Sequence, residues 1–310
     1  MTIQILQTHK LLPRCEQDLA KRFAVHKLHE ADDREALLAR VGADIRGIAG
    51  SNVDAALMDR LPKLEIIANF GVGYDSVDTA AARARNIRVT NTPNVLNDAV
   101  AELTIGLMIA LARRIPQADQ YVRQGLWPKK GNFPLLTELN GKTVGILGLG
   151  RIGKEIAVRA QAMKMRVVYH GRHKQTDEPF IYYDSLTEMA RDSDWLVVIA
   201  PGGKGTDKLV SREVLEALGP EGCVVNVARG TLIDEAAMLE LLQSGKLGGA
   251  ALDVFEKEPE MSEAFHNLDN VVLSPHQGSG THQTRNKMSD LVIANLEAHF
   301  AGNPLPSAVA

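Results

Sequence analysis

Three side chains suited to carbonyl reduction stand just after three apolar runs of the sequence. Arg229 follows CVVNVA, Glu258 follows GAALDVF, and His276 ends NVVLSPH. Such runs predict buried parallel strands, whose carboxyl ends share one edge of a sheet and border the ligand crevice. A guanidinium, a carboxylate and an imidazole would therefore converge there. Arginine clamps an anion, histidine moves a proton and glutamate holds the histidine, which together suit hydride reduction of a 2-keto acid.

The expected role of each of these residues follows from its chemistry. A carboxylate at Glu258 fixes the tautomer of a neighbouring imidazole and favours its protonated form, which a proton donor to a ketone needs. The rigid fork of Arg229 suits bidentate contact with a carboxylate, and one of its N–H groups can also polarise the keto oxygen. A salt bridge to Asp253 or Glu258 is the alternative role for Arg229.

A glycine signature upstream of these strands predicts a dinucleotide site. The run Gly148-Leu149-Gly150-Arg151-Ile152-Gly153 closes a strand-like segment, 143–148, and opens a helix-like segment, 151–163. The first glycine of such a motif makes a tight turn, the second lets backbone approach the pyrophosphate, and the third lets helix and strand pack closely. The helix N-terminus adds free N–H groups for the phosphates. A glycine-rich turn that binds nothing is the alternative.

The end of the next strand predicts which dinucleotide is preferred. An NAD enzyme usually has an acidic residue there, whereas this chain reads Tyr169-His170-Gly171-Arg172-His173-Lys174. Arg172 and Lys174 suit a 2′-phosphate, with His170 or His173 assisting, so we expect NADP(H), with NAD(H) as the weaker alternative. The other possibility is a solvated basic turn without a phosphate contact.

Further cofactor contacts are expected where the later strands end. They are Val227, Ala228, Asp253 and Gly278. The Asp253 carboxylate can accept a hydrogen bond from the nicotinamide carboxamide and orient the ring. Its alternative role is to cap the turn that follows.

Substrate contacts are expected in the first part of the chain. In FGVGYDSVD, residues 70–78, Val72 and Gly73, with Tyr74, can present backbone N–H groups to a carboxylate, because glycines permit close approach. A plain strand-to-helix turn is the alternative. Asn52 is a further substrate candidate, with helix capping by Asn52 or Asp54 as its alternative.

A segment rich in glycine, proline and polar residues, 124–140, predicts a loop over the surface or the site. Trp127 and Phe133 lie in it. They suit either packing against a substrate side chain or anchoring between domains, and the sequence leaves both open.

The elements that must position these residues form two sets. The chain has 310 residues, more than one core usually holds. Residues 1–91 alternate five strand-like runs with helix-like ones, which indicates a flavodoxin-like parallel sheet, and a second alternating set from residue 143 indicates a Rossmann fold. We expect an α/β protein with a substrate domain of residues 1–93 plus 282–310, an NADP-binding domain of residues 94–281, and the cleft between them.

Bulk composition narrows the possible partners. A net charge of −3 gives no indication of a nucleic-acid or anionic-membrane partner. Cys15 and Cys223 form neither a disulfide framework nor a metal-binding pattern, so a reducing cytoplasm is the default. MTIQILQTHK lacks the pattern of a signal peptide, and the apolar stretch 103–112 is too short to span a membrane.

The motifs together resemble the D-isomer-specific 2-hydroxyacid dehydrogenases over essentially the whole chain. The resemblance is carried by FGVGYDSVD, GILGLGRIG, NVARGTLIDE, ALDVFEKEP and SPHQGSGT. It implies that Arg229 binds substrate, Glu258 orients the histidine, His276 is the acid/base and Asp253 faces the nicotinamide. Family members are generally dimers, and the apolar helix near residues 99–112 is the expected part of such an interface.

Within that family, FPLLTELNGKTVGILGLGRIG, YHGR and HQGSGT look most like the NADPH-dependent glyoxylate/hydroxypyruvate reductases and the related hydroxyphenylpyruvate reductases. The expected reaction is reduction of glyoxylate or hydroxypyruvate to the D-2-hydroxy acid, with aryl pyruvates or 2-ketogluconate as alternative substrates. A dinucleotide-sensing, corepressor-like binding protein is the alternative that is not an enzyme. The joint presence of Arg229, Glu258 and His276 argues against it.

Overall fold

The structure is a computed structural model that describes residues 2–203 and 205–309. The chain divides into two compact units, one formed by Met1–Leu96 with Gly280–Ala310 and the other by Asn97–Ser279. The fold is α/β, with one parallel sheet in each unit, as the alternating pattern predicted. The expected boundaries at 93/94 and 281/282 stay predictions.

The first unit is built on a five-stranded sheet in which all neighbours pair in parallel and the order is β2-β1-β3-β4-β5. This order is that of flavodoxin-like folds. The strands are β1 Gln4–Gln7, β2 Ala24–Lys27, β3 Ile45–Ala49, β4 Ile66–Ala68 and β5 Arg88–Thr90.

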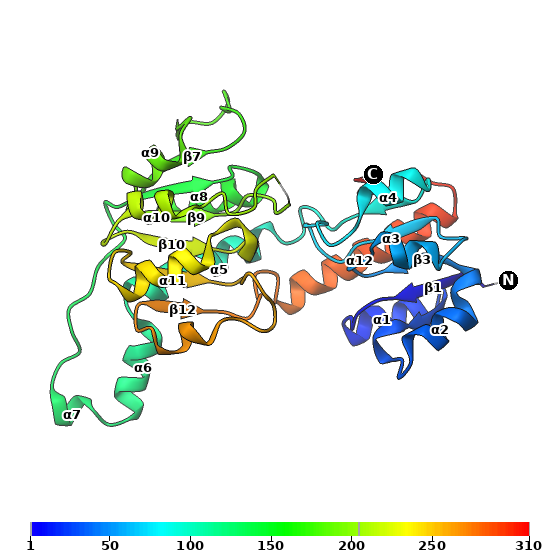
Figure 1. Ribbon diagram of the computed structural model, residues 1–310, viewed down its shortest axis with the longest axis horizontal. Coiled ribbons are helices and arrows are strands. Elements are labelled where there is room, and N and C mark those ends of the chain that lie inside the picture. The colour runs from blue at the N-terminus through cyan, green and yellow to red at the C-terminus, as the bar shows by residue number, and fades with distance from the viewer. Residues whose placement is uncertain (1, 204, 310) are drawn as a thin grey trace. The chain divides into compact units, whose positions relative to one another are not determined.

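Helices cover both faces of this sheet. They are α1 Pro13–Ala20, α2 Arg34–Val41, α3 Ala55–Asp59, α4 Thr79–Ala84 and α12 His282–Phe300, with 3₁₀ turns at Leu28–Glu30 and Gly42–Asp44. One core cluster joins the sheet to α2, α3 and α4, and the other joins it to α1 and α12. The last helix, α12, therefore completes a unit whose other elements come from the first third of the chain (Figure 1).

The second unit is built on a seven-stranded sheet, also parallel throughout, with the order β12-β11-β10-β9-β6-β7-β8. The strands are β6 Thr143–Leu147, β7 Arg166–His170, β8 Ile181–Tyr182, β9 Trp195–Val198, β10 Cys223–Asn226, β11 Gly249–Leu252 and β12 Val271–Leu273. The chain order reverses between β6 and β9, which is where a doubly wound sheet binds its ligand.

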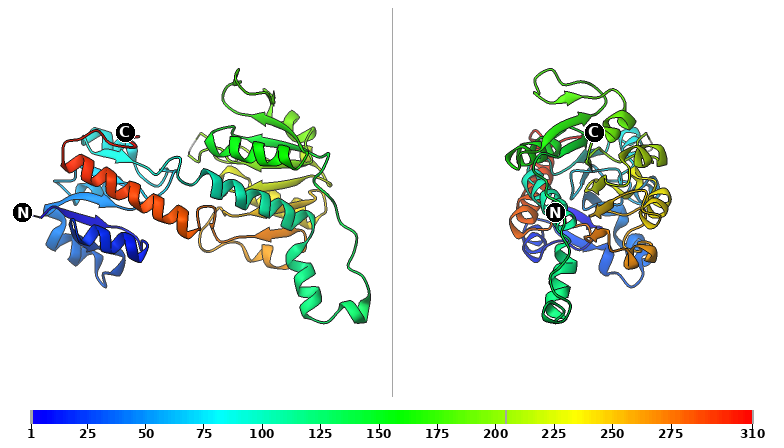
Figure 2. Two further views of the ribbon diagram at one scale, coloured as in Figure 1. Left: turned by 180° about the vertical axis from the view of Figure 1, so that it is seen from behind. Right: turned by 90° about the vertical axis from the view of Figure 1, so that its left-hand side faces the viewer.

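Helices also cover both faces of the second sheet. They are α5 Asn97–Ala112, α8 Arg151–Ala162, α9 Leu186–Arg191, α10 Arg212–Leu218 and α11 Glu235–Gln243, with 3₁₀ turns at Gly230–Leu232 and Glu263–Asn267. The left view of Figure 2 shows α5 beside α8 on one face, and the main core cluster lies under α9, α10 and α11 on the other.

The segment that follows α5 differs from expectation. Two helices, α6 Ile115–Arg123 and α7 Trp127–Lys130, form an arm that continues to residue 140 (Figure 1). Only a loop over 124–140 was expected, so the prediction was wrong for α7 and missed α6. Ile115 and Val122 do recur at helical spacing, but no residue of α6 is buried, and the sequence reasoning passed over this short pattern. Within the described ranges, no helix is both long and apolar enough to cross a membrane.

Candidate active site

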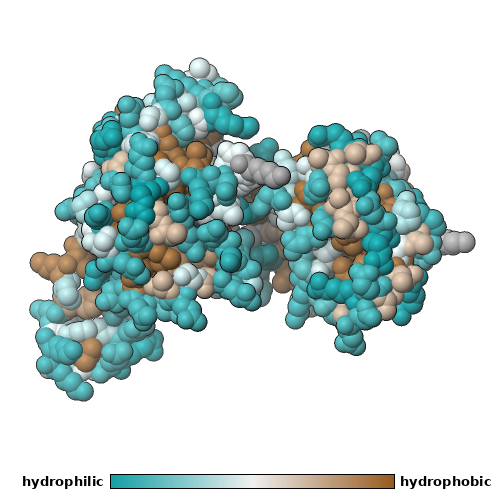
Figure 3. Space-filling model, in the orientation of Figure 1, coloured by the Kyte–Doolittle hydropathy of each residue, from teal (hydrophilic) through white to brown (hydrophobic). Residues whose placement is uncertain are grey.

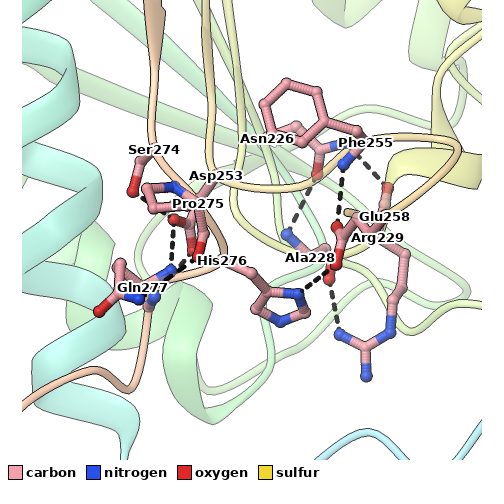
Figure 4. Close-up of polar contacts among 11 residues, drawn as sticks. Asn226, Ala228, Arg229, Asp253, Phe255, Glu258, Ser274, Pro275, His276 and Gln277 are labelled. Atoms are coloured by element: carbon pink, nitrogen blue, oxygen red, sulfur yellow. Dashed lines mark hydrogen bonds and ion pairs between the residues drawn. The ribbon is translucent and has the colours of Figure 1, made fainter. Parts of the chain in front are cut away.

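His276 and Glu258 form a direct pair in the second unit. The His276 Nδ1 atom lies 2.7 Å from the Glu258 Oε2 atom, and the side chains are 50% and 33% exposed. In Figure 4 the imidazole points toward the carboxylate. Because Nδ1 is occupied by Glu258, Nε2 is the ring nitrogen that remains for a substrate.

Glu258 is fixed by a second contact as well. Its Oε1 atom accepts from the backbone N–H of Phe255 at 3.0 Å. Burial opposes the ionised carboxylate, but the hydrogen bonds from His276 and Phe255 and the positive charge of Arg229 outweigh it, so the pKa of Glu258 lies below its ordinary value. The glutamate is thus an ionised partner for the imidazole at neutral pH.

Arg229 is placed beside Glu258 by two close backbone approaches. A Cβ on Gly230 would lie 1.8 Å from the Phe255 carbonyl carbon, so this segment packs directly on the chain leading to Glu258. A Cβ on Gly202 would lie 2.7 Å from the Arg229 Cγ atom, so a glycine leaves room for the arginine stem. The Arg229 Nη1 atom donates to the Ala228 carbonyl at 2.7 Å. The structure therefore gathers all three predicted catalytic side chains.

Asp253 is fully buried at the end of β11 and holds the segment that carries His276. Its Oδ1 atom accepts from Ser274 Oγ at 2.5 Å and from the Gln277 N–H at 2.7 Å, and its Oδ2 atom accepts from the Gly278 N–H at 2.8 Å. These contacts cap the turn after β12 and not the turn that directly follows Asp253, so the capping alternative was placed on the wrong turn. The expected contacts of Asp253 and Gly278 with the cofactor stay predictions, and the Gly278 N–H is already engaged.

The glycine loop after β6 has the shape that a dinucleotide requires. Gly148 has a φ of +103°, and a Cβ there would lie 2.9 Å from the Ala200 nitrogen. A Cβ on Gly153 would lie 2.2 Å from the Gly148 oxygen, whereas nothing lies within 4 Å of one on Gly150. Gly150 makes no side-chain cap at the start of α8, so N–H groups there are open to a phosphate. The residues present fit the pyrophosphate of a dinucleotide.

The basic turn after β7 is exposed, whereas His170, which precedes it, is held by neighbouring residues. Arg172, His173 and Lys174 are exposed, and a Cβ on Gly171 would have open space. His170 is instead an anchor, because its Nδ1 atom lies 2.9 Å from the Tyr183 carbonyl and its ring stacks on Tyr182. Phosphate contacts of this turn, and cofactor contacts of the buried Val227 and Ala228, stay predictions.

The candidates of the first unit have distinct placements. Val72 and Gly73 are half-buried in the loop after β4. Asn52 is exposed with a φ of 60°, and Asp54 caps α3 by accepting from the Leu57 N–H at 2.8 Å. Of the two expected caps, Asp54 is confirmed and Asn52 was wrong, and the contact of Asn52 with substrate stays a prediction.

Trp127 and Phe133 lie in the arm formed by residues 113–140. The Phe133 ring packs edge-on against Tyr121 at 5.3 Å between centroids, and the Trp127 indole donates to Asn132 at 3.4 Å. These contacts hold the arm itself together.

Sequence reasoning missed three residues that hold the site. Ser274 binds Asp253, and Asn226 binds both the Ala228 N–H at 3.1 Å and the Arg229 carbonyl at 2.8 Å. The Gln175 Nε2 atom donates to the Leu149 carbonyl at 2.7 Å, which ties the basic turn to the glycine loop. Asn226 and Ser274 are polar residues at the ends of apolar runs, and this could have marked them as part of the site. Nothing in the sequence distinguished Gln175.

Comparison with known proteins places the chain in one family. The family model described as D-isomer specific 2-hydroxyacid dehydrogenase, NAD binding domain, matches residues 105–278. The chain is 48% identical to the hydroxyphenylpyruvate reductase of Plectranthus scutellarioides, over 94% of this chain and 93% of that protein. It is 45% identical to a glyoxylate/hydroxypyruvate reductase A of Arabidopsis thaliana, over 98% of both.

The same likeness holds among solved structures. An NADPH-dependent glyoxylate/hydroxypyruvate reductase from Sinorhizobium meliloti, solved in complex with NADP and malonate, superposes with a TM-score of 0.96 at 45% identity. The match covers 100% of this chain and 97% of that one. The chain therefore belongs to the family of D-isomer specific 2-hydroxyacid dehydrogenases.

Proposed function

We propose that the protein reduces glyoxylate or hydroxypyruvate to the D-2-hydroxy acid with NADPH. The observation that carries this proposal is the 2.7 Å pair of His276 and Glu258 beside Arg229, at the ends of three neighbouring strands. The names of the reductases from Arabidopsis thaliana and Sinorhizobium meliloti support the substrate and the cofactor.

His276 is the proton donor in this mechanism. The reduced nicotinamide, when bound, supplies the hydride to the carbonyl carbon. The imidazolium gives its Nε2 proton to the carbonyl oxygen, because Nδ1 is held by Glu258. The carboxylate of Glu258 stabilises the imidazolium and keeps the ring in that orientation. Arg229 binds the substrate carboxylate and stabilises the charge that develops on the carbonyl oxygen.

Two further groups of residues bind the ligands. Backbone N–H groups of Val72 and Gly73 bind the substrate carboxylate, with Asn52 as an additional contact. The glycine loop 148–153 binds the pyrophosphate, and Arg172 and Lys174, with His173, bind the 2′-phosphate. The hydrogen bond from Gln175 to the Leu149 carbonyl links these two expected phosphate sites.

Aryl pyruvates are the second candidate substrates. The relative from Plectranthus scutellarioides is named for hydroxyphenylpyruvate, which is an aryl 2-keto acid. Both candidates share the 2-keto acid group, so the proposed roles of Arg229 and His276 are the same for either. A dinucleotide-sensing binding protein is disfavoured, because binding alone needs no histidine–carboxylate pair.

We also propose a homodimer in the cytoplasm. The arm of residues 113–140 exposes Ile115, Val122, Trp127 and Leu135, and Figure 3 shows hydrophobic residues on its surface. Apolar side chains exposed together on one segment are typical of an interface. Cys15 and Cys223 are both free thiols, which suits a reducing compartment. Sedimentation of the wild type and of Val122→Glu tests the dimer, and a monomeric wild type would refute it.

The proposed activity is tested by following NADPH oxidation at neutral pH. Hydroxypyruvate, glyoxylate and phenylpyruvate are compared, and each is repeated with NADH. Fast turnover of the two small acids with NADPH is expected. A preference for phenylpyruvate would favour aryl pyruvates as the substrates. NADPH binding without turnover of any 2-keto acid would refute the proposed reaction.

A further inference from the structure

The loop after β4 has three successive carbonyl groups that each accept a hydrogen bond from an asparagine side chain. The Asn69 Nδ2 atom donates to the Gly71 oxygen at 3.1 Å and to the Gly73 oxygen at 3.0 Å. The Asn91 Nδ2 atom donates to the intervening Val72 oxygen at 2.9 Å. The Thr92 N–H gives the Gly71 oxygen a second bond at 2.9 Å.

This arrangement determines where the N–H groups of the loop point. In a trans peptide the C=O of one residue and the N–H of the next point in opposite directions. The N–H groups of Val72, Gly73 and Tyr74 therefore point away from Asn69 and Asn91. Within the described residues none of these three N–H groups has an acceptor, and the loop is half-buried to exposed there. Neighbouring N–H groups on one side form a concave site for an anion.

The Asn69 amide keeps this orientation although its oxygen atom is left without a hydrogen-bond donor. The residue is 1% exposed, and its Oδ1 atom is buried without a hydrogen-bond donor. Turning the amide over would instead set its oxygen against two carbonyl oxygens, which repel it. The buried acceptor is left unsatisfied so that the amino group can hold both carbonyls.

The backbone of Asn91 is held by Ser307, which in turn is bound to α12. The Ser307 Oγ atom donates to the Asn91 carbonyl at 2.6 Å and accepts from Asn295 of α12 at 2.8 Å. The Asn91 N–H donates to the Ser307 carbonyl at 3.3 Å. The amide that binds the middle carbonyl is therefore tied to α12, the longest helix of the first unit, and the loop conformation does not depend on the loop alone.

We propose that Asn69 and Asn91 are positioning residues for the substrate carboxylate. They hold the carbonyls of residues 71–73 inward, and this aims the N–H groups of residues 72–74 at the carboxylate. The inference rests on the proposed function, in which that loop binds the substrate. Neither asparagine touches the substrate.

The test uses Asn69→Asp and Asn91→Asp in the full-length protein. An ionised carboxylate has nearly the same shape as the amide, but it cannot donate a hydrogen bond and it repels the carbonyl oxygens. The N–H groups of residues 72–74 should therefore no longer point toward the substrate carboxylate. We expect KM for glyoxylate and the inhibition constant of oxalate to rise together by about tenfold or more, since one hydrogen bond to a charged group is worth roughly that factor. KM for NADPH is expected to stay unchanged, and kcat to change far less than KM for glyoxylate.

The matched control is Asn270→Asp in the second unit. Asn270 also donates its amide to two carbonyls, those of Leu242 and Gly248, but it stands at the amino end of β12. It should leave KM for glyoxylate unchanged. An equal rise in the control, or no rise in either test variant that retains NADPH binding, would overturn the proposal. If Asn69→Asp does not fold, Asn91→Asp alone tests the proposal, because it removes only the hydrogen bond to the Val72 carbonyl. A wild type without turnover would instead refute the proposed function.

Discussion

The backbone N–H of His276 donates to the carbonyl of Asp253 at 2.8 Å, where β12 and β11 end side by side. His276 has a φ of 53°, which is a left-handed conformation uncommon outside glycine. The Asp253 carboxylate binds the next two N–H groups, of Gln277 and Gly278. A buried aspartate thus fixes the turn that aims the imidazole at Glu258.

Asp253→Asn is expected to destabilise the protein and to lower kcat. In this variant the side-chain NH₂ group faces at least one of the three groups that donate to the Asp253 carboxylate, so that hydrogen bond is lost. A buried polar group left unsatisfied costs about 1–3 kcal/mol. Urea unfolding measures the loss. Asp54→Asn is the control, because asparagine caps a helix as well as aspartate does, so α3 should keep its cap. Equal stability of Asp253→Asn and wild type would contradict the role of Asp253.

His276→Asn is expected to lower kcat for the 2-keto acid by about 10²–10⁴-fold, which is the usual loss when a general acid is removed. NADPH should still bind, because the glycine loop is unchanged. Fluorescence titration of NADPH accompanies the kinetic measurement. Near-full turnover in this variant would remove His276 from the mechanism.

Glu258→Gln is expected to change the pH dependence of reduction. The pKa of Glu258 lies below its ordinary value, so the carboxylate remains ionised at neutral pH and its pairing with His276 is lost only as pH falls through that lowered pKa. The wild type should keep its activity into mildly acidic pH. In the variant the imidazolium loses its counter-charge, so the alkaline limb of kcat/KM should move to lower pH. An unmoved limb would show that Glu258 does not act through His276.

Arg172→Asp is expected to lower the ratio of kcat/KM with NADPH to kcat/KM with NADH. A carboxylate repels the 2′-phosphate of NADPH and can accept a hydrogen bond from the ribose 2′-hydroxyl of NADH. Arg191→Asp, at the end of α9, makes the same change of charge at another exposed position of the second unit and should leave the ratio unchanged. A ratio unaffected by Arg172→Asp would rule out a phosphate contact of Arg172.

Neither cysteine is expected to react with iodoacetamide in the native protein at pH 8. Burial, together with the charge of Asp194, raises the pKa of the Cys223 thiol to about 12. Burial also raises the pKa of the Cys15 thiol, against a hydrogen bond with Ser289 that lowers it. The thiolate is the reactive form, so activity should survive treatment, whereas both residues should be alkylated in urea. Labelling of the native protein, read by mass spectrometry, would contradict this.

Much of the fold could be predicted because its signals are local. The apolar runs before Arg229 and His276 became β10 and β12, and the glycine run became the turn between β6 and α8. A buried parallel strand must be apolar on both faces, and a tight turn needs glycine, so residue type alone carries this information. The helix α6 was missed although Ile115 and Val122 recur at helical spacing, because the pattern is short and these side chains are exposed.

The sequence by itself determined which chemistry the chain can perform, through Arg229, Glu258 and His276 at strand ends and the glycine loop. Only the tertiary structure decided how those residues are held. It gave the cap of α3 to Asp54 rather than Asn52, joined Asp253 to the backbone around His276, and set Asn69 and Asn91 against three carbonyls. Such partners stand far apart in the chain, and the direction of a hydrogen bond depends on packing that residue type does not encode.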